Sequence, residues 1–275
     1  MLVVKKKRGG IAYKYVWFAD KPTLAQAFGF AIFAQCKYGQ PLPGFSRRKF
    51  LTRMVDLQDS AEVILKNMSR RTAFDVKRAK REGVVVEEVK DMAEFLAFYN
   101  AFAAGKGMST VTAGELANWG SNTVALAARI DGVAVAMHSY IVDPQDGRGR
   151  LLHSGSVFRQ MASNEERSAI GRANRLLHYE AMLAFKAQGL TRYDMGGYAK
   201  DSPDPQLANI AKFKETLGGQ EAREDHYISL PLLVLQSIAA LTASARHLLS
   251  VRMAALWPRR STALEPASPA QGSPS

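Results

Sequence analysis

Three strand-like segments in series constrain this chain more than any other feature of its sequence. They span residues 124–130, 133–142 and 151–157, and the first two are dominated by apolar residues. Asp131-Gly132 separates the first two, and both positions tolerate positive φ, which favours a tight hairpin. Residues 143–147 contain Pro and Gly and separate the second segment from the third. The sequence therefore predicts a sheet core of three consecutive antiparallel strands.

Helices are predicted on both sides of this meander by apolar spacing and by capping residues. The predicted helices span 61–68, 70–82, a segment after Asp91, about 114–119, 168–188 and 206–217, and further strands span 50–57, 84–86, 191–195 and 221–228. Glycines close several helices, as Gly83 and Gly189 do. The fold class that follows is α/β (α+β), with a mixed, mainly antiparallel sheet flanked by helices.

The two ends of the chain differ from this central part. Residues 1–50 are expected to form a strand–helix extension, with the helix over 23–38 and a turn at 41–44. The central domain is expected over 51–229, followed by a helix over 230–257 and a disordered tail rich in Ser, Pro and Ala over 258–275. The last helix is leucine-rich and carries arginines, so it either packs on its own domain or binds an anionic bilayer.

The charge of the chain narrows its partners to molecules that carry phosphate or another anion. The formal net charge is +12, with basic clusters at 5–8, 47–49 and 70–81. Such an excess attracts nucleotides, coenzyme A, RNA or an anionic membrane surface, although a solvated basic face has the same composition. The single cysteine, Cys36, and the lack of a secretory signal predict a cytoplasmic protein, with peripheral contact at the inner membrane face as an option.

Several chemistries are not indicated by any motif in the sequence. The five histidines are scattered without i,i+4 spacing, so no metal site is predicted. No P-loop, nucleophile elbow or dinucleotide fingerprint is present. The helix that follows 151–157 begins with a basic, glycine-containing run, and a helix N-terminus offers N–H groups to an anion. Arg167, Gly171 and Arg172 in this run are therefore candidate phosphate contacts, and ordinary surface charges are the alternative.

Two motifs in the second half of the chain each end in a pair of glycines. Residues 193–197 read Tyr-Asp-Met-Gly-Gly and residues 213–219 read Phe-Lys-Glu-Thr-Leu-Gly-Gly. Together they resemble the FemAB family, and the resemblance extends over about 55–228. It implies the GNAT acyltransferase fold. It also implies an N-acyltransferase that moves an aminoacyl group from aminoacyl-tRNA, or an acyl group from acyl-CoA, onto an amine-bearing cell-envelope precursor.

The resemblance also assigns roles to individual residues. Lys214 would stabilise the oxyanion of the tetrahedral intermediate, and the main-chain carbonyl of Phe213 would hold the attacking amine. A cation placed before reaction stabilises such an oxyanion by several kcal/mol, so elementary chemistry supports the assignment. Tyr193 and Asp194 would orient substrate or act as a base, or Asp194 would cap the turn. Gly196 and Gly197 would let the ligand approach the backbone closely.

The donor and even catalysis itself stay open at this point. Acyl-CoA and aminoacyl-tRNA both fit a basic, phosphate-seeking protein. The alternative to an enzyme is a basic-surface binding module, an RNA or membrane-surface adaptor that retains the fold. Lys214 separates the two interpretations, because an adaptor should tolerate its replacement.

Overall fold

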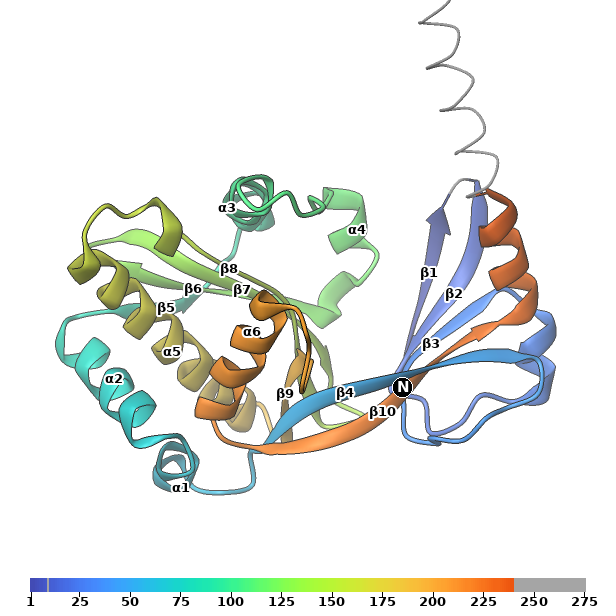
Figure 1. Ribbon diagram of the computed structural model, residues 1–275, viewed down its shortest axis with the longest axis horizontal. Helices are drawn as coiled ribbons and strands as arrows, with labels where there is room; N and C mark the ends of the chain where they lie inside the picture. The colour runs from blue at the N-terminus through green and yellow to red at the C-terminus, as the bar shows by residue number, and fades with distance from the viewer. Residues whose placement is uncertain (9, 240–275) are drawn as a thin grey trace, which may run out of the picture. The chain divides into compact units, whose positions relative to one another are not determined.

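The computed structural model describes residues 1–8 and 10–239, and the strands of this part form one sheet (Figure 1). In sheet order they are β1 (Leu2–Arg8), β2 (Ile11–Trp17), β3 (Ala31–Cys36), β10 (Gln220–Ser229), β4 (Phe45–Asp56), β9 (Arg192–Gly197), β8 (Arg148–Ser156), β7 (Val133–Asp143), β6 (Thr123–Ile130) and β5 (Val85–Glu88). The β2–β3 and β8–β9 pairs are parallel, and the other neighbours are antiparallel. The predicted mixed, mainly antiparallel sheet is confirmed.

The predicted meander is β6, β7 and β8. Asp131 and Gly132 join β6 to β7 with φ of 50° and 78°, as a tight hairpin requires. A register shift between Ser139 and Tyr140 puts an irregularity into the β7–β8 ladder. The antiparallel order of the three strands is as expected from the sequence.

Helices cover both faces of the sheet. They are α1 (Ala61–Lys66), α2 (Arg70–Arg81), α3 (Met92–Ala104), α4 (Ala113–Ala117), α5 (Asn164–Ala187) and α6 (Pro205–Thr216). The long helix α5 packs on β6 and β7 with α2 beside it, whereas α3 packs on the opposite face against β7 and β8 (Figure 1). Leu176, Leu177 and Phe185 of α5 are almost completely buried, and each such side chain contributes about 1.5–3 kcal/mol to folding.

The helix predicted over 23–38 is wrong. A 3-10 helix spans Leu24–Phe28, and β3 follows it between β2 and β10. Phe33 and Ala34 face opposite sides of this strand and are both buried, with exposed fractions of 1% and 0%. A strand buried on both faces forms a continuous apolar run, which periodicity cannot separate from a buried helix.

The boundary expected at residue 50 falls inside β4, which crosses from the N-terminal strands to β9. Residues Met1–Leu233 form one compact unit. Residues 230–239 are helical, and the predicted continuation to 257 and the tail over 258–275 lie outside the described residues. Within the described part, no helix has the length and apolar character needed to cross a membrane.

Candidate functional site

The parallel strands β8 and β9 separate after a short stretch of pairing. Within the described residues their register runs only from Arg148 opposite Arg192 to Arg150 opposite Asp194. A bulge in β9 places Met195 and Gly196 opposite a single residue of β4, and bulges bend a strand and increase its twist. The β8 backbone beyond Arg150 is thereby left open on the side that faces away from β7.

A cavity of about 480 Å³ lies at this separation. Its walls come from α3, β8, α5, β9 and α6. Four cationic side chains line it, namely Lys106, Arg150, Arg159 and Lys214, and none of its lining residues, all within the described part, is an Asp or Glu. The cavity is therefore suited to an anionic ligand.

Lys214 lies in the last turn of α6 at the mouth of the separated strands. Its Nζ donates a hydrogen bond of 2.6 Å to the carbonyl of Gly197, which fixes the ammonium beside the end of β9. Burial lowers the pKa of Lys214 to about 8, and the charge of Arg150 acts in the same direction while Asp194 opposes both. At neutral pH Lys214 is therefore mostly charged, but its pKa lies only about one unit above the pH.

Phe213 precedes Lys214 and lines the same cavity with its side chain. Its carbonyl accepts a hydrogen bond of 2.7 Å from the Thr216 hydroxyl. A carbonyl oxygen has two lone pairs, so this bond leaves one for an amine N–H. The Phe213 ring also stacks against the cation of Arg175, at 5.4 Å from its centroid.

Asp194 is completely buried and does not line the cavity. Its Oδ1 accepts bonds from the hydroxyl of Thr52 and from the N–H of Gly196, the latter at 2.8 Å. Its Oδ2 accepts from Gln35 Nε2 at 2.8 Å and from Arg148 at 3.3 Å. In the structure Asp194 thus holds the bulge at Gly196, which matches the cap interpretation.

Tyr193 is also completely buried, on the other side of β9. Its hydroxyl lies 2.7 Å from His178 Nδ1 and 3.3 Å from the Tyr140 hydroxyl. Burial raises the pKa of Tyr193, so its hydroxyl keeps its proton. Tyr193 reaches the cavity only through His178, which lines it.

Gly196 and Gly197 both line the cavity. Gly196 has φ of 70°, and a Cβ there would come within 3.0 Å of the Leu151 carbonyl. The position therefore requires glycine for its backbone conformation and for its close approach to β8.

Arg167, Gly171 and Arg172 do not line the 480 Å³ cavity but a smaller one of about 220 Å³ between α2 and α5. Arg172 forms a two-point ion pair with Glu82, at 2.8 and 2.9 Å. Arg167 donates to the Met161 carbonyl at 3.0 Å. Arg167 and Arg172 thus lie outside the cavity of Lys214, whereas Gly171 also lines a hollow of about 270 Å³ that includes Phe213.

The N-terminus of α5 is already occupied by acidic residues of its own chain. Ser163 and Glu166 form a capping box, with Ser163 Oγ accepting from the Glu166 N–H at 3.1 Å. Glu165 adds a second carboxylate in the first turn. These carboxylates would repel a pyrophosphate at this helix N-terminus.

Residue types alone did not single out Arg150, Asn174 and His178, which the structure brings into the cavity. A signal was available for two of them, because Asn174 and His178 are polar residues four apart on the apolar face of α5. Nothing in the sequence marks Arg150, since its place depends on pairing with β9 and on Gln35, which is distant in sequence.

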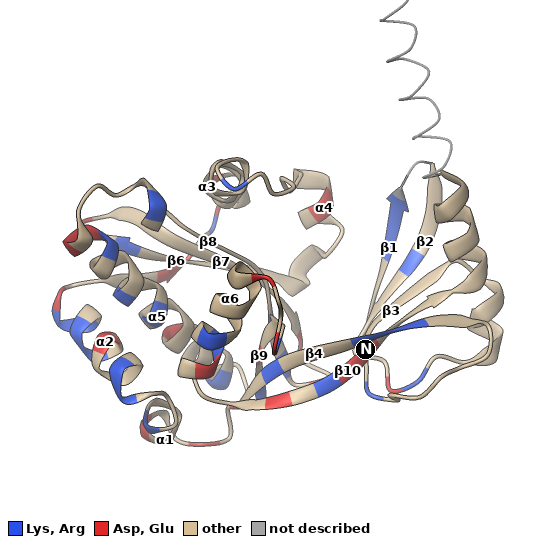
Figure 2. Ribbon diagram, in the orientation of Figure 1, with Lys and Arg blue, Asp and Glu red and all other residues tan. Residues whose placement is uncertain are grey.

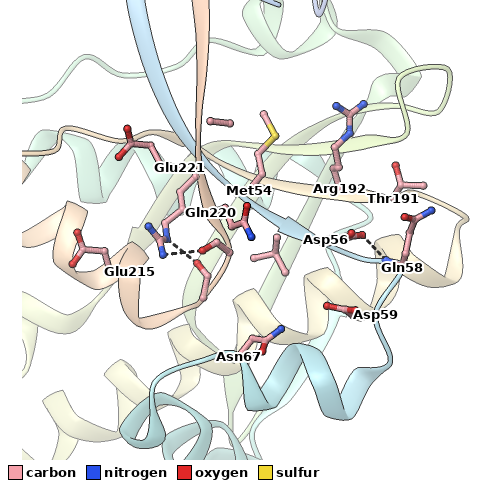
Figure 3. Close-up of a pocket in the computed structure, with 15 residues that line it drawn as sticks. Met54, Asp56, Gln58, Asp59, Asn67, Thr191, Arg192, Glu215, Gln220 and Glu221 are labelled. Carbon is pink, nitrogen blue, oxygen red and sulfur yellow. Dashed lines mark hydrogen bonds between the residues drawn. The ribbon is translucent and has the colours of Figure 1, made fainter.

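A second cavity, of about 740 Å³, lies where β4 ends and β10 begins (Figure 3). Asp56, Asp59, Glu215 and Glu221 contribute carboxylates to it. Arg53 lines it too, with its guanidinium donating to the carbonyls of Gly218 and Gly219 at 2.8 Å each. This larger cavity is acidic, so it does not fit a phosphate-bearing donor. In the described part, no group of three or more His, Cys, Asp or Glu residues is placed to hold a metal ion.

Comparison with solved structures identifies the fold. A crystal structure of FemX superposes with a TM-score of 0.62 at 12% identity, covering 86% of each chain. The C-terminal domain (DUF2156) of a putative lysylphosphatidylglycerol synthetase from Agrobacterium fabrum has a TM-score of 0.51 at 14% identity, covering 87% of this chain and 84% of that one. L-PGS from Bacillus licheniformis has a TM-score of 0.50 at 15% identity, covering 85% and 83%. The chain has a FemAB-like fold.

This FemAB-like fold agrees with the resemblance of the two glycine-terminated motifs. No protein-family model matches the sequence, and a search of curated proteins gives no match. At these identities the superpositions show the fold alone, so the activity has to be argued from the cavity.

Proposed function

We propose that this chain transfers an aminoacyl group from aminoacyl-tRNA to an amine in the cavity between β8 and β9. The observation that carries the proposal is the charge of this cavity, which has four cations and no carboxylate among its lining residues. Phe213 and Lys214 both line it, and the Lys214 ammonium is fixed to the Gly197 carbonyl at the end of β9. The cavity thus combines attraction for a phosphate-bearing carrier with the groups that acyl transfer to an amine needs.

The cavity continues into a basic groove. A hollow of about 270 Å³ shares Lys106, Arg159 and Phe213 with the main cavity, and shares Phe158 and Arg175 with the hollow between α2 and α5. The Lys and Arg residues of α2 and α5 that flank these hollows are drawn in blue in Figure 2.

Cations and two exposed aromatic rings line this groove, together with Asp75 and Glu82, which form ion pairs with Arg71 and Arg78. Phe158 and Phe74 are 43% and 50% exposed, and Arg71, Arg78 and Arg81 line the outer hollows beside them. Helix α2 alone is about 18 Å long, as its 12 residues give. Cations that track a backbone, interleaved with rings on which bases stack, are typical of single-stranded nucleic-acid binding.

The same surface argues against coenzyme A. A coenzyme A pyrophosphate would have to approach the N-terminus of the helix after β8, where Glu165 and Glu166 place two carboxylates. The groove passes this helix at its side, where Arg167, Arg172 and Arg175 lie. The 3′ end of a tRNA can follow the groove without meeting the acidic cap.

The chemistry balances without an enzyme nucleophile. The lone pair of the acceptor amine attacks the ester carbonyl, while the Phe213 carbonyl orients one amine N–H. Negative charge develops on the carbonyl oxygen, and the Lys214 ammonium stabilises it. The intermediate collapses to an amide, and the ribose hydroxyl leaves with a proton. In line with the family resemblance, we place the acceptor among amine-bearing cell-envelope precursors.

A donor-binding experiment tests the proposal. Melting of the full chain would be followed with acetyl-CoA, a longer acyl-CoA or charged tRNA, since a ligand raises Tm according to its affinity. We expect a rise with charged tRNA and none with the thioesters. Binding should weaken in Arg71→Gln and Arg81→Gln, with a shallower salt dependence, whereas Lys7→Gln, an equal charge change on β1, should leave it unchanged.

The outcomes separate three functions. Transfer of labelled amino acid from charged tRNA to lysine-containing peptides, lost in Lys214→Ala, supports the proposal. A Tm rise with acyl-CoA alone contradicts the tRNA donor. Binding of tRNA with no transfer, unaffected by Lys214→Ala, would identify an RNA-binding module instead.

A further inference from the structure

His178 is a buried histidine whose Nε2 forms no hydrogen bond within the described part of the chain. The residue is 2% exposed, lies in the middle of α5 and lines the main cavity. Its Nδ1 contacts the Tyr193 hydroxyl at 2.7 Å, and within the described part of the chain Nε2 has no hydrogen-bond partner. Because His178 lines the cavity and Nε2 is not among the enclosed atoms without a partner, this nitrogen is open to a ligand atom in the cavity.

His178 ends a chain of hydrogen bonds under the cavity floor. Tyr193 contacts the Tyr140 hydroxyl at 3.3 Å, Tyr140 contacts His138 Nδ1 at 2.8 Å, and His138 Nε2 contacts Asn174 Oδ1 at 2.9 Å. Together with the contact between His178 and Tyr193 this series has four hydrogen bonds, and its two neutral imidazoles and two phenols supply one proton for each. Every link is filled only when all four groups donate in the same direction.

The orientation of Asn174 fixes that direction. Its Oδ1 faces His138 and can only accept, so His138 donates through Nε2. If every link is filled, Tyr140 donates to His138 Nδ1, Tyr193 donates to Tyr140, and His178 donates to Tyr193 through Nδ1–H. In this arrangement His178 is the Nδ1–H tautomer, with an unprotonated Nε2 at the cavity.

We propose that His178 Nε2 takes the proton of the attacking amine and returns it to the leaving oxygen. This inference rests on the proposed aminoacyl transfer and adds its proton carrier. As the new C–N bond forms, the amine nitrogen becomes acidic, and its proton passes to Nε2. When the C–O bond breaks, the same proton passes from Nε2 to the ribose oxygen, so His178 ends the cycle neutral.

The surroundings keep His178 neutral at rest. Burial lowers its pKa well below the ordinary value, and His138 on β7, Lys214 on α6 and Arg175 on α5 add to the effect. Tyr193 on β9 stays protonated, and burial lowers the pKa of His138 to about 3. His178 is thus unprotonated at neutral pH and can accept a proton, and the same surroundings make the proton that it gains easy to transfer to the leaving oxygen.

A measurement on the resting protein tests the tautomer directly. In the full chain labelled with ¹⁵N-histidine, nitrogen shifts at pH 7 report which ring nitrogen carries the proton, and His178→Gln assigns the signal. We expect a protonated Nδ1 and an unprotonated Nε2. Protonation at Nε2, or at both nitrogens, overturns the inference. Tyr193→Phe removes the partner of Nδ1 and should change the tautomer population while His226, on another strand, is unaffected.

Transfer kinetics test the proton carrier. With charged tRNA and Nα-acetyl-lysine amide as amine probe, His178→Gln and His178→Phe should both lower kcat about 100-fold or more, with tRNA affinity within twofold of wild type. Glutamine can accept a hydrogen bond but cannot carry the proton, so a near-normal His178→Gln overturns the role. The tautomer experiment does not involve tRNA, so it can succeed or fail independently of the proposed donor.

Discussion

Replacing Lys214 by arginine gives the sharpest test of how the cavity stabilises charge. Lys214 has a pKa of about 8, lowered mainly by burial, and its ammonium is fixed to the Gly197 carbonyl. Arginine stays protonated throughout the usable pH range. The wild-type protein therefore loses the positive charge at position 214 as pH rises, whereas Lys214→Arg keeps it.

The expected magnitude follows from this pKa. A lysine of pKa 8 is about 90% protonated at pH 7 and about 10% protonated at pH 9. If only the charged form stabilises the oxyanion, the ratio of the wild-type rate to the Lys214→Arg rate should fall about tenfold over this interval. The ratio cancels the ionisation of the acceptor amine, which changes both rates alike. Lys214→Met should lose about 100- to 1,000-fold at pH 7, the effect of removing one oxyanion donor.

Single-turnover transfer from charged tRNA, measured between pH 6.5 and 9, provides both rates. In Lys214→Met, the residual rate should no longer show the change near pH 8 that the titration of Lys214 causes in the wild-type protein. A ratio that stays flat or rises with pH would refute the electrostatic role, and a rise would indicate that the neutral lysine acts as a base.

Three further predictions concern stability, measured by urea unfolding. Gly219→Ala should destabilise the protein by about 3 kcal/mol or more, because its Cβ would lie 2.3 Å from the Met54 carbonyl, whereas Gly83→Ala, at a similar φ in open space, should cost only about 1 kcal/mol. Asp194→Ala should cost about 3 kcal/mol or more because it removes the acceptor of buried hydrogen bonds from Thr52, Gly196 and Gln35, and a loss under 1 kcal/mol would contradict the structural role of that carboxylate. The free energy of unfolding should fall as pH drops from 6.5 towards 4, by about 1.4 kcal/mol per pH unit for His138 alone. Burial lowers the pKa of His138 in the folded protein to about 3, so over this range the unfolded chain binds one proton more than the folded protein. A flat profile would show that His138 is not buried as a neutral imidazole.

The sequence was sufficient where local chemistry decides the structure. The β6–β7 hairpin follows from Asp131 and Gly132, whose positive φ values the turn needs. The motif containing Phe213 and Lys214 and the pair Gly196–Gly197 were chosen from resemblance, and the structure brings all four residues to one cavity. Each of these groups is close in sequence, or at the end of a predicted element.

Sequence reasoning was insufficient where distant segments decide. The segment of β3 has the spacing of a helix, and only its position between β2 and β10 makes it a strand. Arg150 enters the cavity through its pairing in β8 and its contact with Gln35. Arg167 and Arg172 line the groove rather than the cavity of Lys214, and their role as phosphate contacts stays a prediction.

Gln35 connects the N-terminal strands to the strands that carry the candidate site. It is completely buried at φ of 54° in β3, a conformation that a side chain other than glycine adopts only under constraint. Its Nε2 donates to Asp194 and to Glu224, at 2.8 and 2.9 Å, and its Oε1 accepts from Arg150. One amide thus connects the carboxylate that holds the Gly196 bulge to a cation that lines the cavity. Both the donor and the acceptor of this buried amide are satisfied, so it ties β3 to Asp194 on β9 and to Arg150 on β8. Strands β8 and β9 form walls of the cavity, and the N-terminal strand β3 thereby helps to fix their geometry.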